Sequence, residues 1–344
     1  MKMNDRIAPN TLLRKRVLSL MSVFLLGLAG NASALTVTVS IPPLAGIIAP
    51  LLGPADELHV LLKPGVSPHG FQLRPSHVRL LQDSDLVISV GTPVDAWIVK
   101  PLQLVNKTPI AMARLPNVER LALRQGGLWE DKHLHSDELT HRKLGSDAHE
   151  ADNDSVNHSQ GNPVENSHLD GHLWMSLYNA KQMVIVVSQQ LQAKLPGQKE
   201  AIQKRAADWL TRLDKTNLQI MTRLAKVQGE PFLVLHDAFQ YFEHHYGLNG
   251  VGSIRLNPEL APSLKRVHEL RERIKDGHVT CLFKEPQFPE KRITSVVSGL
   301  DVKLGSLDPM GTSYVLNKPF MQYDAFLTAL SNQFYSCLTK GKVL

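Results

Sequence analysis

Long apolar runs are almost absent from this sequence. After residue 34, no segment reaches the roughly 20 apolar residues that a transmembrane helix requires. The mostly apolar run at residues 17–28 is too short to span a bilayer as a stable helix. It follows the basic residues 14–16 and precedes the small residues 32–34, which is the pattern of a secretory signal peptide. The sequence therefore predicts a signal peptide over residues 1–34 and an exported mature chain.

Cysteine is equally scarce, with only Cys281 and Cys337 among 344 residues. The residue directly after the predicted cleavage point is Leu35 and not a cysteine, so we expect a freely diffusing periplasmic protein without a lipid anchor. In an oxidising compartment a disulfide bridge between the two is the default, and the alternative is two buried free thiols. Neither cysteine has a second cysteine at chelating spacing, which argues against a thiolate metal site.

Excess charge of one sign is also missing from the predicted mature chain. The net charge of +6 includes five Lys or Arg and one Asp within residues 1–34. Without them, 33 basic and 31 acidic residues remain, a balance of +2. The composition therefore gives no reason to expect a nucleic-acid partner.

Short β-rich runs alternate with helical stretches along the rest of the chain. We expect strands at residues 35–40, 58–62, 85–90, 232–235, 279–283 and 302–307, and helices at 75–82, 261–274 and 289–298. Strand followed by helix, repeated, predicts a mostly parallel α/β sheet flanked by helices. About 310 mature residues exceed what one core usually serves, so we expect two Rossmann-like lobes, over residues 35–194 and 229–344.

A long amphipathic helix is predicted between the lobes. Residues 198–227 carry apolar side chains at helical spacing, including Ile202, Ala206 and Leu213, with no Pro or Gly before Gly229. The connecting segment 195–228 should therefore be rigid. It would limit how far the two lobes can swing.

Residues 128–170 break the pattern of strands and helices. They have few aliphatic residues and many Asp, Glu, Ser and Asn, so they predict a mobile surface loop. Six histidines in the loop are about three times the number expected by chance, which favours weak metal collection. They are His133, His135, His141, His149, His158 and His168.

Three histidines elsewhere lie where predicted strands or loops end. His69 follows the second strand, His172 opens the segment HLWMSLYNA, and His236 comes directly after FLVL. Ligands of open α/β sheets bind beyond the carboxyl ends of the strands, so these side chains can converge in the cleft between the lobes. Asp308, in SLDPMGT, occupies an equivalent place. Three imidazoles with a carboxylate or water suit a tetrahedral Zn²⁺, although each could also be a core histidine.

The segments KPGVSPHGFQLRPSHVRLLQDSDLVISVG, HLWMS, FLVLHDAFQYFEHHYGL, CLFKEPQF and LDPMGT resemble the zinc-uptake solute-binding proteins of bacterial ABC importers, the ZnuA type. The resemblance covers nearly the whole mature chain. It implies that His69, His172 and His236 bind zinc, and that Asp308 ligates it or lies near it. The acidic insertion and the cysteine pair are also similar to features of this group. Some members carry a glutamate before the first histidine, where this chain has Pro68, so the fourth ligand is either Asp308 or water.

The resemblance implies capture of Zn²⁺ and its delivery to an inner-membrane ABC permease by a monomer. An auxiliary periplasmic zinc chaperone is a further candidate partner. Two other functions remain open: a manganese or iron carrier of the same fold, and a zinc hydrolase with Glu243 or Glu285 as general base. The motifs HExxH, GxSxG and GxxxxGK[ST] are absent, which disfavours an enzyme.

Overall fold

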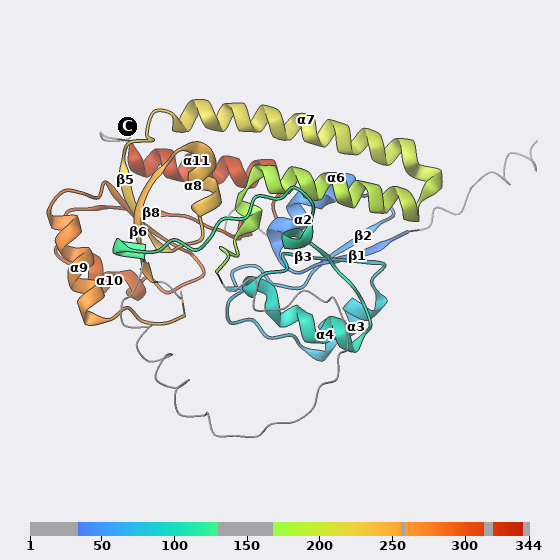
Figure 1. Ribbon diagram of the computed structural model, residues 1–344, viewed down its shortest axis with the longest axis horizontal. Coiled ribbons are helices and arrows are strands. Elements are labelled where there is room, and N and C mark those ends of the chain that lie inside the picture. Colours follow the sequence, from blue (N-terminus) through green and yellow to red (C-terminus); the bar gives the residue numbers. More distant parts are fainter. Residues whose placement is uncertain (1–33, 130–167, 256–258, 313–318, 340–344) are drawn as a thin grey trace, which may run out of the picture.

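Two parallel four-stranded sheets form the frame of the protein, as Figure 1 shows for the computed structural model. The structure describes residues 34–129, 168–255, 259–312 and 319–339. The predicted signal peptide, apart from Ala34, and five of the six histidines of the predicted loop lie outside these residues. No helix in the described ranges is long and apolar enough to cross a bilayer.

The two sheets have the same topology, with a new strand added on either side of the first. The first sheet has the order β2–β1–β3–β4 and the second has the order β6–β5–β7–β8, with every pair parallel. The prediction of two parallel α/β lobes is confirmed. The strands are β1 (Thr36–Val39), β2 (Glu57–Val60), β3 (Leu86–Ser89), β4 (Ile110–Ala111), β5 (Pro231–His236), β6 (Asn249–Arg255), β7 (Cys281–Lys284) and β8 (Lys303–Ser306).

Two strands, β4 and β6, were not predicted from the sequence. Strand β4 has only two residues, which is too short for any periodic pattern. Strand β6 contains Gly250 and Gly252, which weaken its strand pattern. Each glycine makes room for a neighbour, because an added Cβ would lie 2.3 Å from Glu243 Oε2 or 2.4 Å from Leu128 Cβ. Tertiary packing therefore explains the two glycines that prevented the prediction of this strand.

Helices cover both faces of the sheets. Helices α3 and α4 lie against the first sheet and α9 and α10 lie near the second, while the longest helices run across the top of the view in Figure 1. The helices are α2 (Pro42–Ile48), α3 (Pro75–Asp83), α4 (Val99–Leu104), α6 (Leu177–Lys194), α7 (Lys199–Leu224), α8 (Gln240–Tyr246), α9 (Leu264–Lys275), α10 (Lys291–Val297) and α11 (Tyr323–Leu338).

Helix α7 is the predicted connector between the lobes. It has 26 residues and packs along α6 of the first lobe and α11 of the second (Figure 1). Trp209 Nε1 donates a hydrogen bond to Ile47 O at 2.8 Å, and Arg212 pairs with Asp324 of α11 at 2.5 Å. One rigid helix therefore contacts both lobes along its length.

Side chains alternate between two apolar clusters along the central strands. In β5, Phe232 and Val234 belong to a large cluster, whereas Leu233 and Leu235 belong to a smaller one beneath α9 and α10. The large cluster also contains Val37 of β1 and the buried face of α7. The two lobes therefore share one continuous hydrophobic core.

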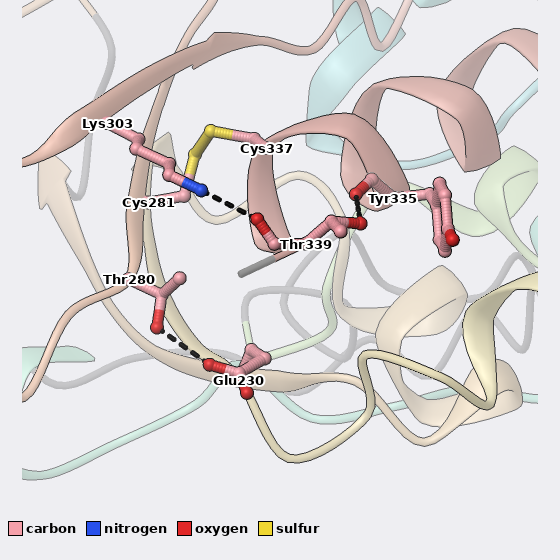
Figure 2. The surroundings of a disulfide bond; sticks show 7 residues. All are labelled: Glu230, Thr280, Cys281, Lys303, Tyr335, Cys337 and Thr339. Carbon is pink, nitrogen blue, oxygen red and sulfur yellow. Dashed lines mark hydrogen bonds between the residues drawn. A yellow bond between two sulfur atoms is a disulfide. The ribbon is translucent and has the colours of Figure 1, made fainter. Parts of the chain in front are cut away.

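The predicted disulfide is present and links β7 to α11. Cys281 and Cys337 are bonded, with Cα atoms 5.9 Å apart (Figure 2). Beside the bridge, Lys303 Nζ donates to Thr339 O at 2.6 Å, and the Thr339 hydroxyl donates to Tyr335 O at 2.6 Å. The disulfide and the bond from Lys303 hold the end of α11 against the second sheet.

The ends of the predicted loop 128–170 belong to the described fold. At the first end, residues 127–129 form a 3-10 turn, and Leu128 packs against the smaller cluster of the second lobe. At the other end, Leu169 forms a bridge with Ala122, and His168 O accepts a hydrogen bond from Leu123 N at 2.8 Å. The predicted loop, residues 128–170, therefore includes a few residues at each end that belong to the folded lobes. Composition alone does not reveal the contacts that hold these residues.

Candidate metal site

Three histidine-bearing segments meet between the lobes. His69 lies in the loop between β2 and α3, and His172 comes directly before a short 3-10 turn, Leu173–Met175. His236 is the last residue of β5, the strand at the centre of the second sheet. The cleft therefore receives two histidines from the first half of the chain and one from the second.

The three imidazoles are close enough to share one ion. One ring nitrogen from each of His69, His172 and His236 lies within 4.8 Å of the others. The ring centroids are 5.2 to 5.6 Å apart, and the Nε2 atoms of His172 and His236 are separated by 3.4 Å. Two nitrogens on a tetrahedral zinc, with bonds near 2.0 to 2.1 Å, would lie about 3.3 Å apart. The observed separation therefore suits a zinc ion.

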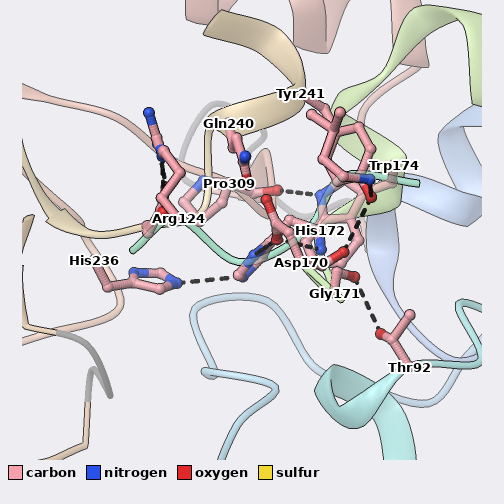
Figure 3. A network of polar contacts seen from close by, with 12 residues as sticks. Thr92, Arg124, Asp170, Gly171, His172, Trp174, His236, Gln240, Tyr241 and Pro309 are labelled. Atoms are coloured by element: carbon pink, nitrogen blue, oxygen red, sulfur yellow. Dashed lines mark hydrogen bonds and ion pairs between the residues drawn. The ribbon is translucent and has the colours of Figure 1, made fainter. Parts of the chain in front are cut away.

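A carboxylate orients each of the two buried histidines. His172 Nδ1 lies 2.8 Å from Asp170 Oδ1, and His236 Nδ1 lies 2.5 Å from Glu285 Oε1. With the Nδ1 proton donated to a carboxylate, the Nε2 lone pair is left for a metal. Both Nε2 atoms point toward the space between the rings, as the link between them in Figure 3 shows.

The Asp170 segment is itself held by further hydrogen bonds (Figure 3). The backbone carbonyl of Asp170 accepts from the Tyr241 hydroxyl at 3.2 Å, and the carbonyl of the next residue, Gly171, accepts from Thr92 Oγ1 at 3.1 Å. The Trp174 ring then donates to the carbonyl of Pro309 at 2.9 Å. Residues from both lobes thus position His172.

Burial and charge act in opposite ways on the pKa values of the histidines. Burial, with the neighbouring His236 and His172, lowers the pKa of His69 to about 2. Burial also acts to lower the pKa of His236, but the adjacent Glu285 carboxylate outweighs it and raises that pKa above its ordinary value. The lowered pKa favours the neutral form of His69, which can bind a cation, whereas the raised pKa favours the protonated form of His236.

Apolar side chains enclose the cavity that the three rings line. The cavity has a volume of about 10 Å³, and its lining includes Trp174, Phe288 and Met310. His172 and His236 are only 7% and 3% exposed, while His69 is partly exposed. A cation in this space would be shielded from water, which strengthens its interaction with the nitrogen donors.

Asp308 lies near the cavity but outside the group of three ring nitrogens. It is fully buried, and its Oδ1 accepts hydrogen bonds from Gln287 Nε2 at 2.5 Å and from Met310 N at 2.9 Å. Gln287 and Met310 line the cavity. Asp308 is thus bonded to two lining residues but is not itself among the residues that line the cavity.

The two glutamates considered as general bases have different surroundings. Glu243 is buried and paired with Arg124, whose Nη1 lies 2.6 Å from Glu243 Oε2 and which also pairs with Asp237. Glu285, at the end of β7, bonds to His236. No pattern in the sequence indicated a role for Asp170 or the pairing of Glu285 with His236, apart from the positions of these residues shortly before HLW and directly after CLFK.

A family model described as "Zinc-uptake complex component A periplasmic" matches residues 37–337. The chain belongs to this family. It is similar to the "High-affinity zinc uptake system protein ZnuA" of Yersinia pestis, with 35% identity over 93% of this chain and 96% of the relative. The protein of the same name from Haemophilus ducreyi is 32% identical, over 94% of this chain and 99% of the relative.

The fold is shared with solved ZnuA structures. A zinc-bound crystal structure of a ZnuA deletion mutant has a TM-score of 0.69 at 17% identity, over 90% of this chain and all of that one. Members of the ZnuA family are periplasmic components of zinc-uptake systems that work with an ABC transporter permease, and they are not enzymes. The hydrolase that the sequence left open is therefore not the function of this protein.

Proposed function

We propose that this protein captures Zn²⁺ in the periplasm with His69, His172 and His236 and delivers it to the membrane permease of an ABC importer. The observation that carries the proposal is the meeting of three ring nitrogens within 4.8 Å of one another in one enclosed cavity. Membership of the zinc-uptake family supports the choice of cargo.

The donor set favours zinc over manganese. Three imidazole nitrogens suit Zn²⁺, whereas carboxylate and other oxygen donors suit Mn²⁺ better. Two of the nearby carboxylates, Asp170 and Glu285, each bond through one oxygen to a histidine Nδ1, and the group that could share an ion consists of three ring nitrogens. Iron also accepts imidazole, so a competition among metals is part of the test.

The test is metal analysis of the purified protein with competition binding against a chelator. Replacing His69, His172 or His236 singly by Ala should each weaken zinc binding by at least about 100-fold, since a ligand contributes more than its supporting partners. His268→Ala is the matched control, because its side chain is 75% exposed and should leave affinity unchanged. Tight binding that survived all three ligand substitutions would contradict the proposal.

Water is the fourth ligand that we propose, in preference to Asp308. Asp308 Oδ1 already accepts from Gln287 and Met310, and Asp308 is not among the residues that line the cavity. Asp308→Asn keeps the shape of the side chain and should leave zinc stoichiometry intact with a loss in affinity below about 10-fold. A loss as large as that of the histidine variants would make Asp308 the fourth ligand.

Export by a cleaved signal peptide is a further part of the proposal. The basic residues 14–16, the apolar residues 17–28 and the small residues 32–34 support it. The mature protein is then a monomer in the periplasm. N-terminal sequencing of protein from the periplasmic fraction should begin near Leu35, and light scattering should give the mass of one chain.

The histidine-rich segment is proposed to collect zinc weakly and to pass it to the tight site or exchange it with an auxiliary chaperone. Five of its histidines, between positions 133 and 158, lie outside the described residues. The sixth, His168, is exposed and only four residues before His172 in the chain. This short separation supports a role in feeding the site.

A further inference from the structure

The loop that carries His69 has different neighbours on its two sides. Residues 63–70 lie between β2 and α3 of the first lobe. On that side, Trp97 Nε1 donates to Pro68 O at 3.1 Å, and Phe71 packs edge-on against the Trp97 ring. The loop is therefore fastened to its own lobe just before and just after His69.

The second lobe contacts the same loop through Thr312. Gly65 N donates a hydrogen bond to Thr312 Oγ1 at 3.1 Å, a bond that joins residues 247 positions apart. Thr312 is 5% exposed and follows Asp308 in the segment after β8. Glu259 of the second lobe also lies beside Gly70. The hydrogen bond from Gly65 thus crosses the cleft at a position four residues before His69 in the chain.

His172 is held across the cleft much more firmly. Trp174, two residues after it, is fully buried, donates to Pro309 O, and accepts through its own carbonyl from the Tyr323 hydroxyl at 2.6 Å. His172 itself bonds to Asp170 through both its ring and its backbone N–H. Movement of His172 would therefore break several buried hydrogen bonds.

His236 is held within the second sheet. His236 lies opposite Arg255 in the parallel pairing of β5 with β6. Its ring forms a hydrogen bond with Glu285, which directly follows β7. The ring is 3% exposed, in contrast to the partly exposed ring of His69. Of the three histidines, His69 is consequently the one that can leave with the fewest broken contacts.

We propose that Thr312 is a latch that positions His69 on the zinc ion, so that release begins when the Gly65 to Thr312 hydrogen bond opens and His69 withdraws. His172 and His236 then hold the ion until it leaves. This inference rests on the proposed function, because it presupposes zinc at the three histidines. It assigns Thr312 the role of a positioning residue that does not touch the metal.

The test compares Thr312→Val with Thr312→Ser in the full mature protein. Valine has nearly the same shape but cannot accept the hydrogen bond, whereas serine retains the hydroxyl. Zinc release, followed by stopped-flow mixing with a fluorescent chelator, should be about 2- to 12-fold faster in T312V, the range for one neutral hydrogen bond. T312S should restore the parent rate, and zinc stoichiometry should stay the same in both.

A double-mutant cycle with His69→Ala separates the latch from a general loss of stability. If Thr312 acts through His69, T312V should not accelerate release further once His69 is absent. Equal acceleration in both backgrounds would overturn the proposal, and so would a parent-like rate in T312V or a fast rate in T312S. A parent protein that binds no zinc would instead be a failure of the proposed function.

Discussion

Glu285 forms a hydrogen bond with the His236 ring and, against the effect of burial, raises its pKa. Its carboxylate lies 2.5 Å from His236 Nδ1 and is itself buried, so it both orients the ring and increases its basicity. Glu285→Gln should keep the size of the side chain but remove the charge. We expect zinc affinity to fall by about 10- to 100-fold, measured by chelator competition.

The matched control for this substitution is Glu290→Gln. Glu290 pairs with Lys284 at the surface, where its side chain is 66% exposed, so its charge should not influence the site. If E285Q and E290Q bound zinc equally well, the Glu285 carboxylate would have no role in metal binding.

The pH dependence of binding also belongs to the residue scale. Because the pKa of His236 is raised, the free protein holds its proton more tightly, and zinc must displace that proton. Zinc affinity should therefore fall as the pH decreases, and this decline should begin above pH 6.5. His69, with a pKa of about 2, stays neutral throughout this range and should contribute nothing.

Apparent dissociation constants measured between pH 5.5 and 8.5 test this expectation. In E285Q the main force that raises the pKa of His236 is gone, so the decline in affinity should start at a lower pH than in the parent. Binding that did not vary with pH in the parent would contradict the assignment of His236 as a ligand.

At the scale of elements, the histidine-rich segment can be removed only within narrower limits than its composition suggests. Leu128 packs on the second lobe, and Asp170 holds His172, so both ends must remain. Deleting residues 130–167 should leave one tight zinc site and reduce the number of weakly bound ions, counted by calorimetry.

A full-length variant with serine in place of the five histidines between positions 133 and 158 is the control for this deletion. It should lose the same weak binding while retaining the length of the segment. Unchanged stoichiometry in both variants would remove the proposal that the segment collects zinc.

At the scale of the whole molecule, the shared core limits the movement between the lobes. One hydrophobic cluster runs through both lobes, and α7 packs on α6 and α11 at the same time. Opening the lobes as separate bodies would expose much of that apolar surface to water, at about 25 cal/mol per Å². We therefore expect local loop movement to accompany release.

Small-angle X-ray scattering of the zinc-free and zinc-loaded protein should give superimposable curves. Differences between the two forms should instead appear near residues 63–70, for which hydrogen exchange is the direct measurement. A clear increase in the radius of gyration on removal of zinc would show a hinge opening that the shared core does not favour.

Much of the fold was predictable because its strands and helices have strong local patterns. The apolar runs of β1, β3 and β5 and the spacing in α7 led to two parallel sheets joined by a long helix. Strand β6 was missed because two glycines weaken its strand pattern. These glycines leave room for Glu243 and Leu128, which belong to other segments of the chain. Such reasons exist only in the folded chain.

The sequence by itself determined the class of fold, the three histidines at the ends of strands and loops, and the cysteine pair that forms the disulfide. Only the tertiary structure decided that Asp170 and Glu285 orient two of these histidines, that Asp308 bonds to Gln287, and that a hydrogen bond from Gly65 to Thr312 crosses the cleft. The physical reason is that local periodicity governs strands and helices. The direction and charge environment of a side chain, in contrast, depend on neighbours brought together from distant parts of the chain.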